Sequence, residues 1–233
     1  MSRVGIVVPS SNTTAEPEFR AALPDGCTLH AARMPLEDVT AEDLDAMADG
    51  AERAASLLSH ASVDGVAYAC TTGSLIHGPG FDADLESRLS EIAGAPAVAT
   101  ALSVVRALNA LAVNRVAVAT PYAAELDRLE REYLTANDFE VVAIDGHGLV
   151  SNNEIGELAA VDAEQHGRAV LSDAPEADAL FVSCTNYRSI PALASLEAAF
   201  DIPVISSNAA TIWDLCQRIG IQPNLHIKLT TVD

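Results

Sequence analysis

The chain carries very little positive charge. Only 13 of its 233 residues are lysine or arginine, against 33 aspartates and glutamates, and Lys228 is the single lysine. The formal net charge of −20 at pH 7 repels nucleic-acid phosphates and anionic membranes, so we expect neither as a partner. Acidic side chains with almost no lysine suit a salt-rich cytoplasm, where dissolved ions screen the self-repulsion. We therefore expect a halophilic protein.

Long apolar segments are also missing. Although 49% of the residues are hydrophobic, the longest apolar stretches have the length of strands and are interrupted by polar residues, which argues against a transmembrane helix. The first apolar run, residues 4–8, passes directly into the polar segment 10–14 and is too short for a signal peptide. We expect a globular cytoplasmic protein that is long enough to bury a sizeable core.

The sequence lacks the motifs of common cofactor and nucleophile sites. No G-x-G-x-x-G follows the first strand-like run, and neither a Walker loop nor a G-x-S-x-G elbow is present. None of the four cysteines forms a C-x-x-C pair, so free thiols are expected rather than disulfides or a metal site. We expect no cofactor and no metal. The cysteines are Cys27, Cys70, Cys184 and Cys216.

Two of these cysteines follow strand-like segments. Residues 66–74 read VAYACTTGS and residues 180–189 read LFVSCTNYRS, so in each an apolar run ends at a cysteine followed by small hydroxyl and amide residues. In open parallel sheets, ligands bind beyond the carboxyl ends of the strands. A single buried cysteine is usually a packing residue. The repetition with matching polar residues favours two functional thiols, Cys70 and Cys184.

The whole chain repeats in the same order. Residues 4–9 (VGIVVP) match 116–121 (VAVATP), and residues 95–100 (APAVAT) match 202–207 (IPVISS), each displaced by about 110 positions. Strand-like and helix-like segments alternate, which is typical of parallel α/β sheets. The predicted fold is α/β, with two pseudosymmetric lobes that each hold a four-stranded, mainly parallel sheet flanked by helices. We assign residues 1–105 to the first lobe, 106–208 to the second, and expect 209–233 to return to the first.

Two such lobes would bring equivalent strand ends to a shared cleft, where ligand sites are common. Cys70 and Cys184 would then flank one small molecule. One thiol could attack or remove a proton on one face while the other supplies a proton on the opposite face. His77, the nearest histidine after Cys70, lies beyond a glycine-rich turn and is expected to be a loop residue rather than a base.

The ordered set of motifs resembles the aspartate/glutamate racemase superfamily, and within it the maleate cis-trans isomerases. The motifs are 9–14 (PSSNTT), the two cysteine turns, 120–122 (TPY) and 151–156 (SNNEIG). The resemblance covers nearly the whole chain and implies a cofactor-free, homodimeric enzyme with one cysteine from each lobe at its cleft. It implies that Cys70 adds to the double bond of maleate, that the bond rotates and fumarate leaves, and that Cys184 donates and accepts the proton.

Addition of a thiolate to an alkene that bears two carboxylates builds up negative charge, so the cleft must supply hydrogen-bond donors. The resemblance implies this role for Asn12, Tyr122 and Asn152. Asn153 is an alternative to Asn152, and Tyr122 could instead be a packing residue. Arg188 could bind a carboxylate through two hydrogen bonds. The complete expected substrate-binding set is Ser11, Asn12, Thr13, Thr71, Thr72, Tyr122, Asn152, Thr185 and Asn186.

Other activities of similar proteins remain as alternatives. Arylmalonate decarboxylases resemble the chain but lack the first cysteine, so Cys70 argues against decarboxylation. Amino-acid and hydantoin racemases keep both cysteines, although a racemase of amino acids also needs a partner for the substrate ammonium, and no acidic residue immediately flanks Cys70 or Cys184. The expected ligand is thus a small dicarboxylate or an amino-acid-like compound. A non-catalytic protein that binds a small acid is a second alternative.

Overall fold

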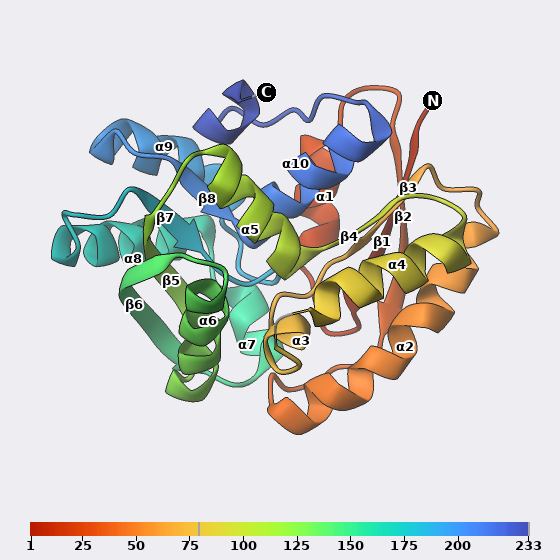
Figure 1. Ribbon diagram of the computed structural model, residues 1–233, viewed down its shortest axis with the longest axis horizontal. Coiled ribbons are helices and arrows are strands. Elements are labelled where there is room, and N and C mark those ends of the chain that lie inside the picture. Colours follow the sequence, from red (N-terminus) through yellow and green to blue (C-terminus); the bar gives the residue numbers. More distant parts are fainter. Residues whose placement is uncertain (79, 233) are drawn as a thin grey trace.

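Two four-stranded sheets form the centres of two lobes in the computed structural model, which describes residues 1–78 and 80–232 (Figure 1). The strand order is β2-β1-β3-β4 in the first sheet and β6-β5-β7-β8 in the second, and the strands pair in parallel in both. The predicted fold class is confirmed. The strands are β1 (Arg3–Pro9), β2 (Thr28–Met34), β3 (Gly65–Tyr68), β4 (Ala97–Ala99), β5 (Arg115–Tyr122), β6 (Glu140–Leu149), β7 (Ala179–Val182) and β8 (Val204–Ser206).

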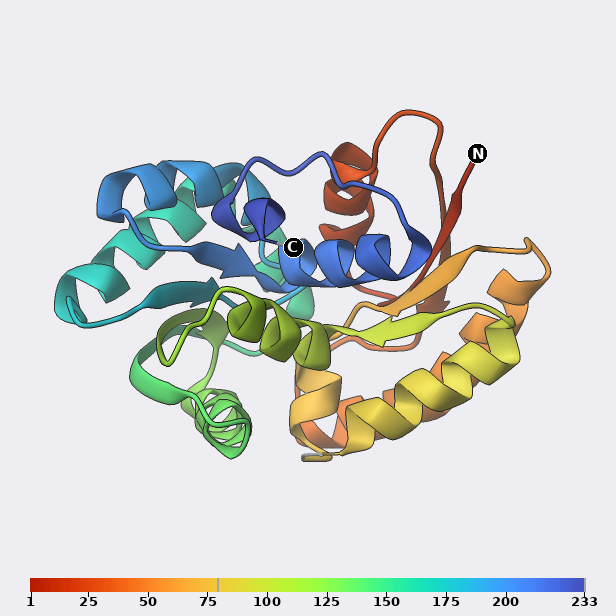
Figure 2. The same cartoon turned by 45° about the horizontal axis from the view of Figure 1, so that its top comes forward.

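Helices cover both faces of each sheet (Figures 1 and 2). In the first lobe α2 and α4 pack on one face, and α1 and α10 on the other. In the second lobe α8 and α9 lie opposite α6. The helices are α1 (Ala15–Ala22), α2 (Ala41–Ser59), α3 (Thr72–Leu75), α4 (Phe81–Ala93), α5 (Thr100–Ala110), α6 (Ala124–Ala136), α7 (Asn152–Glu157), α8 (Ala160–Asp173), α9 (Ile190–Phe200) and α10 (Ser207–Ile219), followed by a 3₁₀ turn, η1 (Lys228–Thr231).

The inner strands are apolar on both faces because helices cover both. Every residue of β3 and β7 is buried, and β1 and β5 are buried along all but their first residue. In the sequence, such strands are therefore continuous runs of apolar residues and do not alternate between apolar and polar residues. Their register is fixed by parallel pairing, as in Val4↔Gly65 and Val116↔Ala179, which brings the carboxyl ends of corresponding strands to equivalent positions in the two lobes.

Helix α10 joins the two lobes. It begins where β8 of the second lobe ends, yet it lies against β3 and β4 of the first lobe and along α5. The close approach depends on Gly65, because a Cβ atom there would lie 2.8 Å from both Ile219 and Leu215. At the contact with α5, the Thr211 hydroxyl donates to the Thr100 hydroxyl (2.9 Å). The two lobes therefore share part of their core.

Ionic contacts reinforce this junction. Arg106 of α5 binds Glu86 of α4 through two hydrogen bonds (2.7 and 2.8 Å) and also donates to Asp214 of α10 (2.7 Å). Asp214 also accepts from the Ser103 hydroxyl (2.8 Å). The carboxylates are largely buried, so each requires these donors to offset its lost hydration. The cluster fixes α10 on the first lobe.

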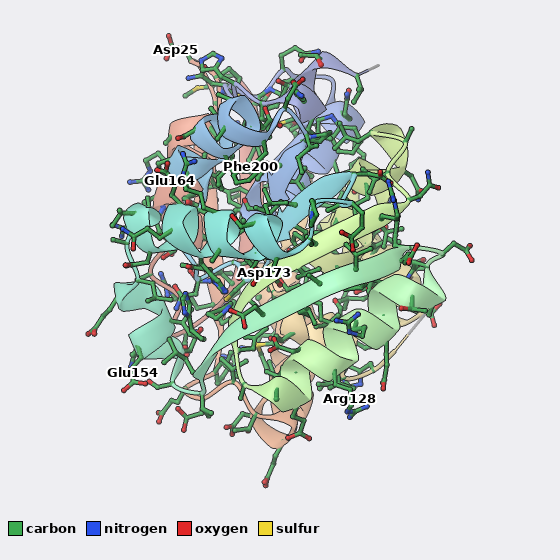
Figure 3. The ribbon with its side chains drawn as sticks, turned by 90° about the vertical axis from the view of Figure 1, so that its left-hand side faces the viewer. Asp25, Arg128, Glu154, Glu164, Asp173 and Phe200 are labelled. Atoms are coloured by element: carbon green, nitrogen blue, oxygen red, sulfur yellow. The ribbon has the colours of Figure 1, made fainter. Side chains whose placement is uncertain are left out.

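Most of the acidic surplus faces solvent. Figure 3 shows Glu154 and Asp173 on the outside of the second lobe and Asp25 at the edge of the first, and all three are exposed. Separated exposed charges of this kind interact weakly once salt screens them. Within the described part of the chain, no helix has the length and apolar character needed to cross a bilayer.

Candidate active site

Cys70 and Cys184 line one small cavity between the lobes. Each follows the last strand residues of an inner strand, β3 or β7, and each is a free, buried thiol. Six of the nine expected substrate-binding residues share the cavity wall with them. The lining consists of Pro9, Asn12, Leu36, Val39, Cys70, Thr71, Thr72, Tyr122, Asn152, Cys184 and Thr185.

The other three expected residues lie directly behind this wall. Ser11 accepts a hydrogen bond from the Asn152 amide (2.7 Å). Asn186 accepts from the backbone N–H of Thr13 (2.9 Å) and donates to the carbonyl of Asn152 (2.6 Å). The bonds between Ser11 and Asn152 and between Thr13 and Asn186 cross between the lobes, so the three residues hold the cavity wall together instead of lining the cavity.

The residues that the sequence left as alternatives lie in different places. Asn152 is buried at the cavity whereas Asn153 is exposed, and Tyr122 faces the cavity. Arg188 is exposed and does not line the cavity. The ring of His77 stacks on the ring of Phe81, with 4.1 Å between the centroids, and His77 is not among the residues that line the cavity.

Cys70 lies at the start of the short helix α3. Its Sγ accepts from the backbone N–H of Gly73 (3.4 Å) and lies 3.8 Å from the Thr72 hydroxyl. Burial raises the pKa of the Cys70 thiol, and these two donors act in the opposite direction. Backbone N–H groups at a helix start are suited to a thiolate because they donate without adding a countercharge.

Cys184 has an unusual backbone conformation. Its φ of 91° lies in a region that side-chain-bearing residues rarely adopt and that costs about 1–3 kcal/mol. The conformation lets its Sγ accept from the backbone N–H of Asn186 (3.3 Å), while its own N–H donates to the Ser207 hydroxyl (3.0 Å). Burial raises the pKa of the Cys184 thiol to about 12, opposed mainly by the Tyr122 hydroxyl. Cys184 is therefore a thiol at neutral pH, able to donate a proton.

Hydrogen bonds between the lobes fix the two cysteine turns relative to each other. The Thr185 hydroxyl donates to the carbonyl of Ala69 (3.1 Å) and accepts from the Asn12 amide (3.1 Å). On the other side of the cavity, the Thr71 hydroxyl donates to the Ser207 hydroxyl (2.9 Å). The residues after each cysteine thus contact the opposite lobe.

Arg33 holds the loop that carries Asn12, and no feature of the sequence motifs points to it. It lies near the end of β2, donates to the carbonyls of Ser10 (2.9 Å) and Asn12 (3.0 Å), and pairs with Glu16. The Asn12 side chain in turn accepts from the backbone N–H of Ala15 (2.9 Å) at the start of α1. An arginine at the end of a strand adjacent to a site loop is the signal that could have indicated this role.

Residues of both lobes cover the cavity. Leu36 and Val39 come from the link between β2 and α2, and the Val39 N–H donates to the carbonyl of Val150 (2.9 Å). A single antiparallel bridge pairs Asp38 with Ser151 beside it. The cavity volume is about 10 Å³, close to the room that one water molecule needs. Any ligand larger than a water molecule therefore requires this part of the wall to move as it enters.

Three buried carboxyl groups surround the site without lining it, and the sequence did not indicate them. Burial raises the pKa of Glu18 to about 7, that of Glu130 to about 8, and that of Asp82 above its usual range. Glu130 accepts from the Ser183 hydroxyl and Asp82 from the Tyr133 hydroxyl, both at 2.6 Å. The helical spacing of the buried residues 126, 130, 133 and 134 could have placed Glu130 on the buried face of α6.

A profile of the arylmalonate decarboxylase family matches residues 4–228. The chain belongs to the maleate isomerase/arylmalonate decarboxylase family of the Asp/Glu racemase superfamily. The resemblance expected from the motifs is confirmed. Among the family's characterised members, the maleate isomerase of Nocardia farcinica is 33% identical over 230 residues, which cover 94% of this chain and 90% of that protein.

Solved structures of maleate isomerases share the fold. A cysteine-to-serine mutant of the Nocardia farcinica enzyme with a covalently bound succinylcysteine intermediate superposes with a TM-score of 0.92 at 30% identity, covering 98% of both chains. The maleate isomerase of Pseudomonas putida S16 with maleate has a TM-score of 0.90 at 27% identity, covering 98% of this chain and 95% of that one. Members of this family are enzymes, and the architecture matches throughout.

Proposed function

We propose that the protein isomerises maleate to fumarate through a covalent succinyl-cysteine-type intermediate on Cys70. The observation that carries the proposal is the pair of thiols, one from each lobe, that line a single enclosed cavity. The similarity to maleate isomerases, one of them with a succinylcysteine intermediate, supports the same chemistry.

In the first half of the reaction, the Cys70 thiolate forms a C–S bond to one alkene carbon. The electron pair of the double bond moves to the neighbouring carbon, which takes the proton from the Cys184 thiol. The central bond is now single and rotates. In the second half, the Cys184 thiolate removes that proton, the double bond re-forms in the trans geometry, and the C–S bond breaks. Both cysteines regain their starting states, so atoms and electrons balance.

The two substrate carboxylates would be bound by neutral donors. The amides of Asn12 and Asn152 each keep a second N–H beside their bonds to Thr185 and Ser11, and they belong to the cavity wall together with the hydroxyls of Thr72 and Tyr122. Apart from the reacting Cys70 thiolate, none of the described lining residues is charged, so the negative charge that develops on addition would be stabilised by fixed dipoles. The Tyr122 hydroxyl, which opposes the effect of burial on Cys184, also stabilises the Cys184 thiolate formed halfway through.

A two-cysteine racemase is the alternative, because the same pair of thiols suits proton transfer on opposite faces of a carbon. A substrate ammonium needs an acidic or carbonyl partner, and none of the described side chains on the cavity wall is acidic. An arylmalonate carries an aromatic ring and is larger than a four-carbon dicarboxylate, so a cavity of about 10 Å³ would have to open further to admit it. A small dicarboxylate fits the wall best.

The assay is to incubate the protein in separate reactions with maleate, L-aspartate, L-glutamate, a hydantoin and an arylmalonate. Fumarate is followed by absorbance, racemisation by chiral chromatography and decarboxylation by release of carbon dioxide. We expect fumarate from maleate, loss of that activity in Cys70→Ala and Cys184→Ala, and activity close to wild type in Cys27→Ala. Turnover of another substrate with maleate unchanged would overturn the proposal, and binding without any turnover would indicate the non-catalytic alternative.

A further inference from the structure

We propose that Glu18, a residue of the first lobe, is a positioning residue for Cys184 in the second, and that protonation of Glu18 releases the Cys184 turn. The turn comprises residues 184–190, which connect β7 to α9. The expected effect on maleate turnover rests on the proposed function, whereas the expected effect on the accessibility of Cys184 does not.

Glu18 crosses from α1 to the far end of the turn. Its Oε1 accepts from the backbone N–H groups of Ser189 and Ile190, both at 2.9 Å, and these residues begin α9. Its Oε2 accepts from the Asn208 amide at 2.7 Å. All of these partners belong to the second lobe or to the start of α10, and the Glu18 side chain is almost wholly buried among them.

Asn208 connects Glu18 to the other end of the turn. The same amide nitrogen that donates to Glu18 also donates to the carbonyl of Thr185 (2.9 Å), the residue directly after Cys184. Glu18 and Asn208 together therefore hold both ends of the 184–190 turn. Directly before Thr185, Cys184 keeps its φ of 91°, a conformation that persists only where surrounding contacts over-determine it.

The hydrogen-bond pattern is that of an ionised carboxylate. Three N–H groups donate to Glu18, and a protonated carboxyl would place an O–H against one of them. Burial opposes ionisation and raises the pKa of Glu18 to about 7, while its donors and the nearby positive charge of Arg188 act in the opposite direction. Glu18 thus changes its charge near neutral pH, where loss of one donor contact loosens the turn.

Labelling with iodoacetamide, measured for each cysteine by peptide mass spectrometry, tests this directly. Cys216 is the internal reference, because burial raises its pKa to about 12, as it does that of Cys184, so the change in thiolate fraction with pH cancels in the ratio of their rates. In the wild type, we expect the ratio of Cys184 to Cys216 labelling to rise about tenfold as the pH falls through about 7.

Two variants show whether Glu18 positions the Cys184 turn or only contributes to the stability of the fold. In Glu18→Gln the oxygen can still accept from the α9 backbone, but an amide nitrogen faces the Asn208 donor, so the ratio should be high and independent of pH. Glu197→Gln is the matched control. Glu197 is also buried and accepts a backbone N–H, from Val204 (3.0 Å), but does not contact the turn. It should follow the wild type.

Kinetics supply the second measurement. We expect kcat for maleate to fall as the pH drops through about 7 in the wild type and in Glu197→Gln. Ionisation of Cys70 affects all three proteins equally, so the ratio of the wild-type kcat to the Glu18→Gln kcat isolates the effect of Glu18. This ratio should be about ten above neutral pH and approach one as the pH drops through about 7, with little change in KM. A ratio of Cys184 to Cys216 labelling that does not change with pH in the wild type would overturn the inference, even if Glu18→Gln does not fold. The same pH dependence of that ratio in Glu18→Gln as in the wild type would also overturn it. If the wild type leaves maleate unchanged, the proposed function fails while the labelling ratio still decides the role of Glu18.

Discussion

Replacing Glu130 by glutamine should flatten the pH dependence of stability above neutral pH. The Glu130 carboxyl is fully buried on α6, accepts from Ser183 at 2.6 Å, and has its pKa raised to about 8 by burial, against 4.5 ordinarily. The folded protein therefore binds a proton at Glu130 that the unfolded chain has already released. Stability from this group is complete below about pH 4.5 and is lost as the pH rises through about 8.

The size of the effect follows from the two pKa values. Each pH unit between them is equivalent to about 1.4 kcal/mol, so the full interval corresponds to about 5 kcal/mol. The most informative window is from about pH 7 to about pH 8, because the Glu130 carboxyl ionises there, while the remaining ionisation of Glu18, with a pKa of about 7, is common to both proteins and cancels in their difference. In that window the wild type should lose about 1 kcal/mol relative to Glu130→Gln.

Urea unfolding at constant high salt measures this difference. The free energy of unfolding is determined at each pH for the wild type, Glu130→Gln and the exposed-site control Glu154→Gln, with m-values checked for constancy. The amide introduced at position 130 carries a pH-independent cost, which does not alter the slope. Parallel curves for the wild type and Glu130→Gln between about pH 5 and about pH 8 would refute the reasoning, and so would equal flattening by Glu154→Gln.

Three other predictions follow from features of the fold. Gly65→Ala should lower the unfolding free energy by about 1–3 kcal/mol in urea titrations, because its methyl group would meet Ile219 and Leu215 at 2.8 Å; unchanged stability would show that α10 is not packed there as described. The unfolding free energy of Cys184→Gly should be at least as high as that of Cys184→Ala, because glycine adopts a φ of 91° without strain. Ordinarily the alanine variant would be the more stable of the two by about 1 kcal/mol. With a net charge of −20, the midpoint of thermal unfolding should rise across a potassium chloride series, and greatest stability at low salt would contradict the expected screening.

The fold could be predicted because its signals are local and repeated. Buried strands, polar strand ends and helix-like segments each leave a pattern in a few neighbouring residues, and the internal repeat showed that two sets of them exist. The position of Cys70 and Cys184 at strand ends followed from the same patterns. Their place on one cavity wall required the additional step that equivalent strand ends of two lobes meet.

The surroundings of the cavity could not be predicted in the same way. Arg33 donates to backbone carbonyls in the loop that follows β1, the strand next to its own. Glu18 accepts from N–H groups 171 and 172 positions further along the chain. Neither contact produces a short motif in the sequence. In a chain with 33 acidic residues, a buried glutamate looks like any exposed one. Ser11, Thr13 and Asn186 were found near the site by strand-end position, but position alone does not tell a lining residue from one behind it.

The placement of α10 also bears on how the chain is made. The β3 and β4 face of the first lobe remains uncovered until residues 207–219 have been synthesised, so the amino-terminal half cannot complete its core as it leaves the ribosome. Contacts that join α5 to α10 close a loop of about a hundred residues, which favours slow, cooperative assembly over independent folding of two halves. A fragment that ends before α10 would consequently expose an apolar sheet surface and aggregate, whereas the two halves expressed together could restore each other's core.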